Sequence, residues 1–504
     1  MPEDVELIAY ADRFGGDLPG LQQVLDGPLA GLFSGAHILP FFRPFDGADA
    51  GFDPQDHTEV DERLGSWDDV RAIGQDRDVM VDVIVNHVSS SSVQFRDWLE
   101  NGADSAYDGM FLTYDGAFPD GATEEQLMLL YRPRPGLPFT PYTRSDGTKR
   151  LMWTTFTGEQ IDLDVRQQVT RDYLVRVLDR LAQAKVTRVR LDAVGYAVKT
   201  PGLTSFMTPE TFDFIDELTT WGHERDLTVL VEVHSYYKHQ VEIAAKVDYV
   251  YDFALPPLVL HALHAKDADP LLAWLDVRPT NSITVLDTHD GIGVIDVGAD
   301  ATDHSQPGLL TPQQIDELVE SIHAASGGTS EAATGAAAAN VDLYQVNCTF
   351  FDALGADDDR YLLARALQFW TPGIPQVYYV GLLAGRNDTE LLAQTGVGRD
   401  VNRHHYTREE IEDELRRPVV VALLGLIRLR SSHAAFDGEL NIDGGGQQLS
   451  MTWTNGAAVA ELRADLAAGS GTVRWSDGDG GMQQSSLADL GAAADVGTDA
   501  AATG

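Results

Sequence analysis

Short, almost continuously apolar runs alternate with helical patterns along most of this chain. Strands that are covered on both faces need apolar residues at nearly every position. Such runs, rich in β-branched and aromatic side chains, occupy 6–11, 36–42, 79–85, 186–191, 227–231, 282–286 and 374–380. Apolar residues at helical spacing lie between them, at 18–25, 169–184, 209–224 and 359–370. Alternation over several hundred residues predicts an α/β fold of the (β/α)8 TIM-barrel type.

An acidic residue follows three of these runs: Asp192, Glu232 and Asp290. In a (β/α)8 barrel the loops after the strands gather at one end, so the three carboxyl groups would converge. Alternatively, each acid caps the helix that follows it. Convergence is favoured because each acid has a polar neighbour at its strand end. These neighbours are Arg190, His234 and His289.

Two stretches interrupt the alternation, and the end of the chain follows a different pattern. In residues 88–166 the prolines of YRPRPGLPFTPY argue against regular elements. Residues 292–355 combine a helical pattern at 312–325 with an Ala/Gly-rich stretch, and beyond 436 a period of two with glycine turns predicts a small antiparallel β domain. We therefore expect a barrel from 1–87, 167–291 and 356–435, inserted domains at 88–166 and 292–355, and a C-terminal β domain at 436–504.

The charge is strongly acidic, with 78 acidic against 36 basic residues and a formal net charge of −42. Self-repulsion destabilises such a protein in dilute buffer, whereas salt screens it, because the Debye length falls to about 3 Å near 1 M. We therefore hypothesise a cytoplasmic enzyme of a salt-accumulating halophile. Nucleic acids need a basic face, so the charge argues against them as partners.

The N-terminus and the cysteine content bear on location. The acidic start, MPEDVELIAYADRF, lacks the basic region of a secretory signal, and no apolar run approaches the roughly 20 residues that cross a bilayer. We expect no membrane association. The single cysteine, Cys348, cannot form an intramolecular disulfide and is expected to be a small buried apolar residue.

Three convergent carboxyl groups suit the cleavage of a glycosidic bond. One donates a proton, a second acts as nucleophile or base, and a third helps to stabilise an oxocarbenium-like transition state. Aromatic residues in the predicted loops suit stacking on sugar rings, although about half of them could equally pack between domains. These residues are Phe45, Phe52, Phe139, Tyr142, Tyr196, Tyr236 and Tyr237.

Four segments around the acids resemble, in order and spacing, the signature segments of the α-amylase family of retaining glycosidases and transglycosidases. They are DVIVNH (82–87), RLDAVGYAVK (190–199), LVEVHSYY (230–237) and VLDTHD (285–290). Longer stretches, among them HILPFFRPFDGADAGFDP, YRPRPGLPFT, PGIPQVYYVGLLAG and GRDVNR, are similar to the sucrose phosphorylase group of that family. The resemblance extends to about residue 435 and weakens beyond it.

The resemblance implies a retaining double displacement with Asp192 as nucleophile, Glu232 as general acid and base, and Asp290 as stabiliser of the transition state. Sucrose and inorganic phosphate would be converted reversibly to glucose 1-phosphate and fructose, without a cofactor. Arg190 lies two residues before Asp192 on the same strand face and is expected to hold that carboxylate as an anion. Glu232 is expected to stay protonated until it donates to the leaving oxygen.

The resemblance also implies the residues that bind sugar and phosphate. Asp49 and Arg399 match the pair that closes the pocket beyond one glucosyl unit. Arg134 is the best phosphate candidate, because a guanidinium pairs bidentately with phosphate oxygens, although it could simply anchor a proline-rich surface loop. The other expected substrate-binding residues are Phe52, His87, Tyr196, His234, His289, Asp342, Tyr344 and Gln345.

Other interpretations stay open. A divalent-metal site could use Asp82, His87, Glu232, His234, His289 and Asp290, but no His-x-His motif accompanies them, so we expect none. A phosphorylase of glucosylglycerol, glucosylglycerate or sucrose 6'-phosphate, or a plain hydrolase, would need only loop changes around 131–142 and 340–348. A non-catalytic sugar-binding scaffold is disfavoured by the intact acids. The resembled family includes homodimers, which leaves the oligomeric state undecided.

Overall fold

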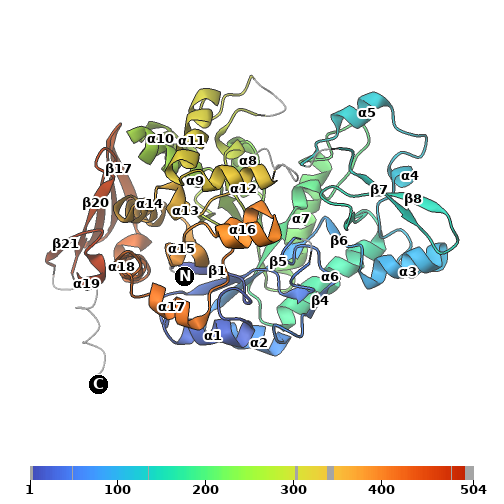
Figure 1. Cartoon of the computed structure of the whole chain (residues 1–504), viewed down its shortest axis with the longest axis horizontal. Coiled ribbons are helices and arrows are strands. Elements are labelled where there is room, and N and C mark those ends of the chain that lie inside the picture. The colour runs from blue at the N-terminus through green and yellow to red at the C-terminus, as the bar shows by residue number, and fades with distance from the viewer. Residues whose placement is uncertain are drawn as a thin grey trace.

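A closed barrel of eight parallel strands forms the centre of the molecule, which confirms the predicted fold class (Figure 1). The structure is a computed structural model that describes residues 4–47, 49–133, 136–300, 305–337, 345–477 and 480–493. In order around the barrel, the strands are β1 (Glu6–Ala9), β16 (Ile374–Tyr378), β13 (Ser282–Thr284), β12 (Tyr249–Asp252), β11 (Thr228–Val231), β10 (Arg188–Asp192), β5 (Asp78–Ile84) and β2 (Gly35–Ile38).

The sequence predicts seven of these eight strands, and the structure confirms them with shorter ends. The missing strand is β12, whose four residues are too few to stand out as an apolar run between charged neighbours. The predicted strand 374–380 is shorter in the structure. β16 ends at Tyr378, and the next residues form α15 (Tyr379–Leu382).

The inner face of the barrel is more polar than the sequence pattern suggests. Successive side chains of a strand point to opposite faces. In β10, Val189 and Leu191 alternate with Arg188, Arg190 and Asp192, and both arginines are buried. Arg190 lies directly beside Asp82 of β5 in the strand register. The barrel therefore encloses charged side chains below the strand ends.

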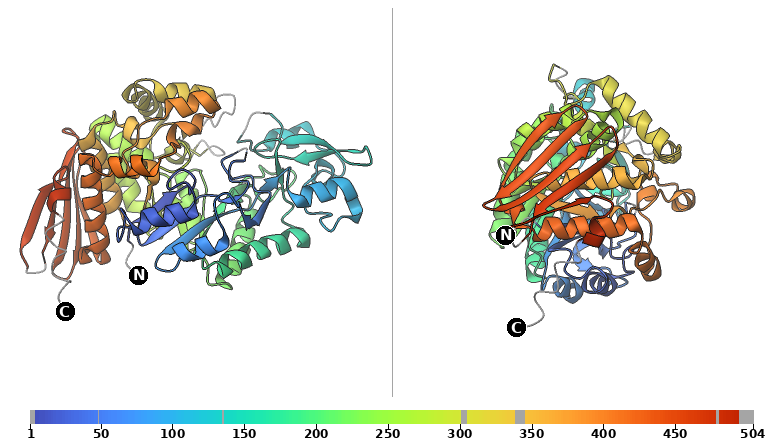
Figure 2. Two further views of the ribbon diagram at one scale, coloured as in Figure 1. Left: turned by 60° about the horizontal axis from the view of Figure 1, so that its bottom comes forward. Right: turned by 90° about the vertical axis from the view of Figure 1, so that its left-hand side faces the viewer.

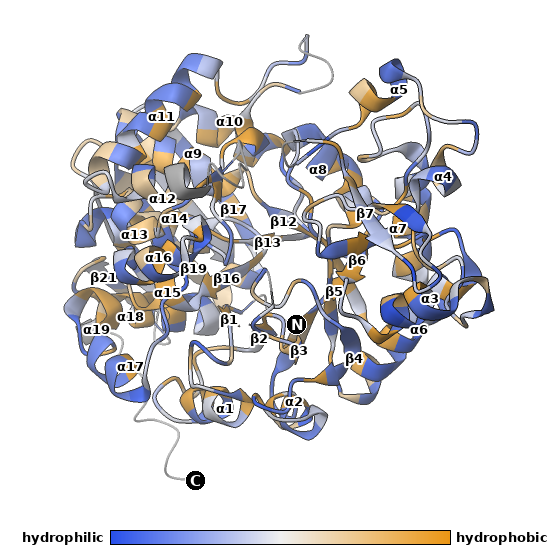
Figure 3. Ribbon diagram, turned by 45° about the vertical axis from the view of Figure 1, so that its right-hand side comes forward, coloured by the Kyte–Doolittle hydropathy of each residue, from blue (hydrophilic) through white to orange (hydrophobic). Residues whose placement is uncertain are grey.

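Helices surround the barrel; most bury one apolar stripe, whereas α9 (Leu255–His261) and α14 (Asp358–Trp370) are buried on nearly all sides. Figure 3 shows hydrophobic and hydrophilic residues on different sides of many of these helices, as amphipathic helices around a sheet require. The helices of this layer include α1 (Leu18–Asp26), α2 (Trp67–Ile73), α6 (Gln168–Gln183), α7 (Pro209–His223), α8 (Tyr237–Ala244), α9 (Leu255–His261), α10 (Asp269–Val277), α14 (Asp358–Trp370) and α18 (Pro418–Ser432). Among the described residues, no helix is long and apolar enough to cross a membrane.

The segment 88–166 lies to one side of the barrel and contains short elements (Figures 1 and 2). Its helices are α3 (Val93–Asn101), α4 (Tyr114–Ala117) and α5 (Glu124–Leu129). Its strands β7 (Phe139–Thr143) and β8 (Lys149–Trp153) pair as a hairpin, and β9 (Gln160–Asp162) pairs with β6 (His87–Ser89). Pro141 does not prevent β7 from forming, because a two-stranded ribbon leaves free edges that tolerate proline.

The segment 292–355 is helical where the structure describes it. It holds α11 (Pro312–Ala325), as the sequence predicts, and α12 (Thr329–Ala337), which falls in the Ala/Gly-rich stretch. The strands β14 (Ile292–Gly293) and β15 (Gln345–Val346) pair and bring Gln345 back beside Gly291. This pairing places the second insertion at the strand ends of the barrel.

A five-stranded antiparallel sheet forms the far end of the molecule, opposite the segment 88–166 (Figure 2). Its strands are β17 (Glu439–Gly445), β18 (Gln448–Asn455), β19 (Ala458–Asp465), β20 (Ser470–Ser476) and β21 (Met482–Ser486). The period-two pattern predicts this sheet, since Leu449, Met451 and Trp453 are buried on one face. The sheet lies remote from the ends of β10 and β11.

Candidate active site

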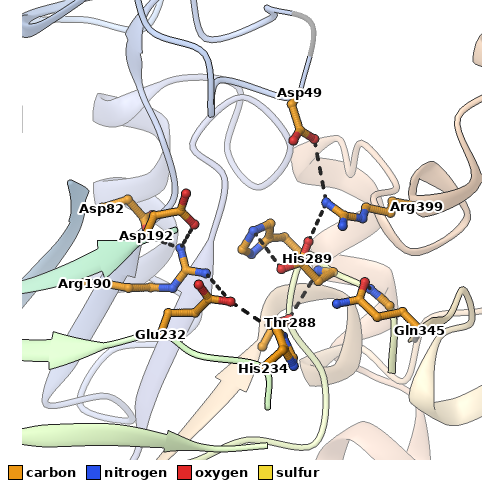
Figure 4. A network of polar contacts seen from close by, with 12 residues as sticks. Asp49, Asp82, Arg190, Asp192, Glu232, His234, Thr288, His289, Gln345 and Arg399 are labelled. Atoms are coloured by element: carbon orange, nitrogen blue, oxygen red, sulfur yellow. Dashed lines mark hydrogen bonds and ion pairs between the residues drawn. The ribbon is translucent and has the colours of Figure 1, made fainter. Parts of the chain in front are cut away.

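A pocket opens at the carboxyl ends of the barrel strands and is also lined by residues of the segments 88–166 and 292–355. The three acids predicted to converge all line it. Figure 4 shows Asp192 and Glu232 beside Arg190, with Asp49 and Arg399 on the opposite side. The pocket is lined by Asp49, Phe52, His87, Tyr131, Pro133, Phe156, Gln160, Asp192, Ala193, Gly195, Tyr196, Phe206, Glu232, Val233, His234, His289, Asp290, Ile295, Gln345 and Arg399.

Asp192 is the last residue of β10, and the chain turns sharply after it. Ala193 has a φ of 54°, in the left-handed region, which costs a non-glycine residue about 1 kcal/mol. The turn leads the backbone away and leaves the Asp192 carboxyl at the pocket floor. Its Oδ1 accepts a hydrogen bond from Arg190 Nη1 at 2.9 Å.

Glu232 follows β11 directly and faces the same arginine. Arg190 Nη2 lies 3.8 Å from Glu232 Oε1, so one guanidinium contacts both carboxyl groups. On the other side, ligand atoms of Glu232, His234 and Asp290 all lie within 4.8 Å of one another. The predicted convergence of the three acids is therefore present in the structure.

The charge of Asp192 depends on opposing effects. Burial raises the pKa of Asp192 well above its usual value, Arg190 acts in the opposite direction, and the nearby Glu232 adds to the rise. Two carboxyl groups so close to one cation bind their protons as a pair. Because Arg190 lies closer to Asp192 than to Glu232, the geometry favours the negative charge on Asp192. An ionised Asp192 stays a prediction.

Asp290 lies at the opposite wall and is surrounded by cations. Arg399 Nη1 is 2.9 Å from Asp290 Oδ1 and 3.8 Å from Asp49 Oδ1, so it bridges the two acids. Burial alone would raise the pKa of Asp290, but Arg399, His289 and Arg403 lower it well below its usual range. Asp290 is therefore an anion near neutral pH.

His234 is held by an acid that the sequence does not single out. Its Nδ1 lies 2.9 Å from Asp296 Oδ2, while Nε2 lies 3.7 Å from Glu232 Oε1 at the pocket. Gly293 permits this pairing, since a Cβ there would meet Asp296 Oδ2 at 2.6 Å. Burial lowers the pKa of His234, but Asp296, followed by Glu232 and Asp290, raises it to about 9. His234 is thus a cation near neutral pH.

Two further predicted histidines shape the floor of the pocket. His289 stacks on Phe52, with ring centroids 4.6 Å apart and an interplanar angle of 8°. His87 lies 2.9 Å from the carbonyl of Phe52 through Nε2 and 3.1 Å from Gln160. Burial lowers the pKa of both histidines, that of His289 to about 3, so both are neutral hydrogen-bonding groups.

The outer part of the pocket is aromatic, and the sequence predicts little of it. Tyr131 stacks on Phe206 with centroids 4.7 Å apart, and Phe156 packs edge-on against Tyr196. Of this group only Tyr196 is predicted. The others belong to irregular loops, which have no periodic pattern that would mark a side chain as facing the pocket.

Most of the aromatic residues proposed for sugar stacking pack elsewhere. Phe52 and Tyr196 line the pocket, whereas Phe139 packs on Trp153 and Tyr142 on Phe95. The remaining three, which also lie outside the pocket lining, are Phe45, Tyr236 and Tyr237. Sequence position within a loop therefore does not separate stacking residues from packing residues.

Three predicted substrate-binding residues lie outside the described part of the chain: Arg134, Asp342 and Tyr344. Gln345 lines the pocket, and its Oε1 accepts a hydrogen bond from the backbone N–H of Gly291. Arg190 lies behind the acids rather than in the pocket lining.

A buried lysine joins the first insertion to the barrel next to the pocket. Lys199 Nζ lies 2.5 Å from Asp162 Oδ2 of β9 and 2.5 Å from Asn86 Oδ1. It also donates to the backbone carbonyl of Tyr196, a pocket residue. The ammonium thus holds three separate segments around one point.

The spacing of Glu232, His234 and Asp290 would also suit a metal ion. A protonated imidazole cannot ligate a metal, and the pKa of His234, raised to about 9, keeps it protonated near neutral pH. Arg190 and Arg399 already contact the two acids. The charges of the cluster are therefore balanced by protein groups.

Known proteins resemble this chain over most of its length. A family model described as the alpha amylase catalytic domain matches residues 7–262. A sucrose phosphorylase of Agrobacterium vitis is 55% identical over 476 residues, covering 94% of this chain and 97% of that protein. One of Bifidobacterium adolescentis is 51% identical over 497 residues, covering 97% and 98%. The crystal structure of a sucrose 6F-phosphate phosphorylase from Thermoanaerobacter thermosaccharolyticum matches with a TM-score of 0.89 at 36% identity, covering 96% of this chain and 99% of that one.

Proposed function

This chain belongs to the α-amylase family, and we propose that it catalyses the reversible phosphorolysis of sucrose to α-glucose 1-phosphate and fructose, with retention of configuration. It is a hexosyltransferase that needs no cofactor for this chemistry. The observation that carries the proposal is the near-complete likeness to two sucrose phosphorylases, combined with three acids around one pocket. Asp49 and Arg399 border the glucosyl side and limit it to one sugar unit.

In the first half-reaction, Asp192 attacks the anomeric carbon as the bond to the fructosyl oxygen breaks. Glu232 gives its proton to that oxygen, so fructose leaves neutral and a glucosyl ester of Asp192 remains. Arg190 favours the anionic form of Asp192 before attack. Asp290, an anion next to His289, stabilises the positive charge on the sugar ring.

In the second half-reaction, phosphate attacks the same carbon and the ester bond to Asp192 breaks. The proton of the phosphate returns to Glu232. An anionic acceptor beside acidic groups needs a compensating cation, and the imidazolium of His234 lies at this place. Arg134, Tyr196, Tyr344 and Gln345 remain candidates for the acceptor site, and Asp342 remains a candidate for substrate binding.

The reaction with and without phosphate tests the proposal. Incubation in high-salt buffer with sucrose and phosphate should give glucose 1-phosphate and fructose, and omission of phosphate should leave little free glucose. Free glucose in both samples without sugar phosphate would make the protein a hydrolase. Sucrose 6'-phosphate, glucosylglycerol and glucosylglycerate serve as competing donors. Faster turnover of one of them than of sucrose would make that compound the preferred substrate.

The same proposal extends to the organisation of the protein. We take residues 88–166 and 292–355 as inserted domains, 436–504 as a C-terminal domain, and the rest as the barrel. Limited proteolysis should cut first at these borders. We place the protein in the cytoplasm and leave the choice between monomer and homodimer to sedimentation analysis, while cell fractionation tests the location.

A further inference from the structure

A chain of buried polar groups runs down the barrel interior from the pocket. Arg190, which contacts Asp192, also contacts Asp82 Oδ1 at 2.5 Å. On its other oxygen, Asp82 faces His37 Nε2 at 3.0 Å. His37 is 1% exposed and Asp82 is fully buried, so bulk water does not stabilise the charge of either group. The protonation state of His37 must follow from its neighbours.

The neighbour of the second ring nitrogen is a tyrosine with its own fixed acceptor. His37 Nδ1 lies 3.1 Å from Tyr251 Oη, and Tyr251 Oη lies 3.1 Å from Gln376 Oε1. The orientation of the Gln376 amide is set by Glu6, because Gln376 Nε2 donates to Glu6 Oε2 at 2.7 Å. Glu6 is itself an anion paired with Arg188 Nη1 at 2.9 Å.

These contacts determine where the protons lie. An amide oxygen can only accept, so the single hydroxyl proton of Tyr251 points to Gln376. Burial raises the pKa of Tyr251, so it stays a neutral phenol with that one proton. His37 Nδ1 must then donate to Tyr251, and His37 Nε2 must donate to the carboxylate of Asp82. A histidine that donates from both nitrogens is an imidazolium.

We propose that His37 is a positioning residue that donates from both ring nitrogens, and that its imidazolium neutralises Asp82 so that Arg190 keeps its charge for Asp192. The column then alternates in sign, since Arg188 faces Glu6, His37 faces Asp82, and Arg190 faces Asp192. With a neutral His37, Asp82 would compete for Arg190 at a shorter distance than Asp192 does. This role rests on the proposed function of Asp192 as nucleophile.

The electrostatics of Asp82 agree with two cationic partners. Burial alone would raise the pKa of Asp82, but His37 and Arg190 lower it to about 2. The charged and titratable groups that face His37 and its partners include Asp82, Tyr251, Arg190, Glu6, Arg188, His289, Asp192 and Glu232. The loss of His37 would remove one of these two cations and leave Asp82 to Arg190, which it contacts directly.

The protonation state of His37 can be read by nitrogen-15 NMR of histidine-labelled protein. The signal that disappears in His37→Gln should show both ring nitrogens protonated at the pH of the activity assay. His57 is an internal reference, because it is also fully buried and bonded to a tyrosine, Tyr173, but burial lowers its pKa to about 3. A neutral His37 would overturn the proposal whether or not the protein phosphorolyses sucrose.

Kinetics test the consequence for Asp192. His37→Gln keeps a donor to Asp82 but removes the charge, and it should lower kcat by about 10- to 100-fold, as loss of an outer partner of a reactive group does. The acid limb of the pH profile should move up by about one unit, because Asp192 binds its proton more tightly with less of Arg190's charge. A loss of activity without this movement would indicate a merely structural role.

A double variant separates charge from packing. In His37→Gln with Asp82→Asn, the competing carboxylate is gone, so most of the kcat lost in His37→Gln should return and the acid limb should move back. Losses that simply add would contradict the proposal. His57→Gln is the matched control for removing a buried histidine, and thermal unfolding verifies that each variant is folded.

Discussion

The glucosyl side and the acceptor side of the pocket are built in different ways. On the glucosyl side, Asp192 and Glu232 lie at or directly after barrel strands, and Asp290 follows six residues after β13. On the acceptor side, Tyr131, Phe156 and Phe206 come from loops. Rigid strand ends hold reacting groups in a fixed geometry, whereas loops vary with the molecule that must be recognised.

The two sides also differ in how charge is controlled. Each acid on the glucosyl side has an arginine within 4 Å, so its charge is set by permanent cations. The described cation of the acceptor side is His234, which titrates. We therefore expect the glucosyl transfer step to depend on the acids themselves, and the choice of acceptor to depend on pH, salt and loop residues.

The largest effect should come from Asp192→Asn, which removes the nucleophile of the glucosyl side. Both phosphorolysis and hydrolysis should fall by about 10⁴-fold or more, because no glucosyl ester can form. Glucose 1-phosphate and free glucose are measured together, with Asp276→Asn on the exposed face of α10 as the control. Retention of either product at near-normal rate would remove Asp192 from the mechanism.

Glu232→Gln should separate acid catalysis from nucleophilic attack. The rate with sucrose should fall by about 10²- to 10⁴-fold, because the fructosyl oxygen no longer receives a proton. A glucosyl donor whose leaving group needs no proton, such as α-glucosyl fluoride, should lose much less. Equal losses with both donors would argue against Glu232 as the acid, and Glu242→Gln on α8 provides an exposed comparison.

Lys199→Met tests how firmly the acceptor side is attached to the glucosyl side. The variant leaves Asp162 buried without its cation, which should cost about 3–5 kcal/mol of unfolding free energy. We expect a lower Tm and a higher KM for phosphate, since Tyr196 loses its support. Lys149→Met, at an exposed position in the same insertion, should change neither quantity.

The charge of His234 should make phosphate binding pH-dependent. With a pKa raised to about 9, the imidazolium is present below that pH and lost above it, so the KM for phosphate should rise roughly tenfold as the pH passes through 9. The stabilisation from its pair with Asp296 has the same sign, being complete below the unfolded value near 6.5 and lost on the way up through 9. In His234→Asn the KM should be high and flat, whereas His223→Asn should resemble the parent.

Salt concentration should have the smallest effect of these changes, and it should act on the KM for phosphate. The net charge of −42 repels phosphate, so raising KCl from 0.1 M to 1 M, which shortens the Debye length from about 10 to 3 Å, should lower the KM for phosphate by a few-fold. Sucrose is neutral, and its KM should change little. A KM for phosphate that climbs with KCl, or full activity after dialysis into low salt, would contradict the halophilic interpretation.

The sequence predicts the barrel and its three acids because both follow from strand periodicity. Asp192 and Glu232 are found from the end of an apolar run alone. The polar barrel interior is found only in part: the contact of Arg190 with Asp192 is predicted, whereas the contacts of Asp82 with Arg190 and His37 join strands that are distant in sequence. Asp296 and Phe156 are missed for a related reason: they lie in irregular segments, where neither period two nor a helical period marks the direction of a side chain.

Lys199 has a consequence for how the working enzyme is maintained. A cation that joins two parts of a protein can be a bound ion or a charged side chain. Only a bound ion can be lost by dilution. Here the cation is the Lys199 side chain, which is part of the protein itself. At constant salt, the mouth of the pocket should therefore keep its shape in the presence of strong chelators.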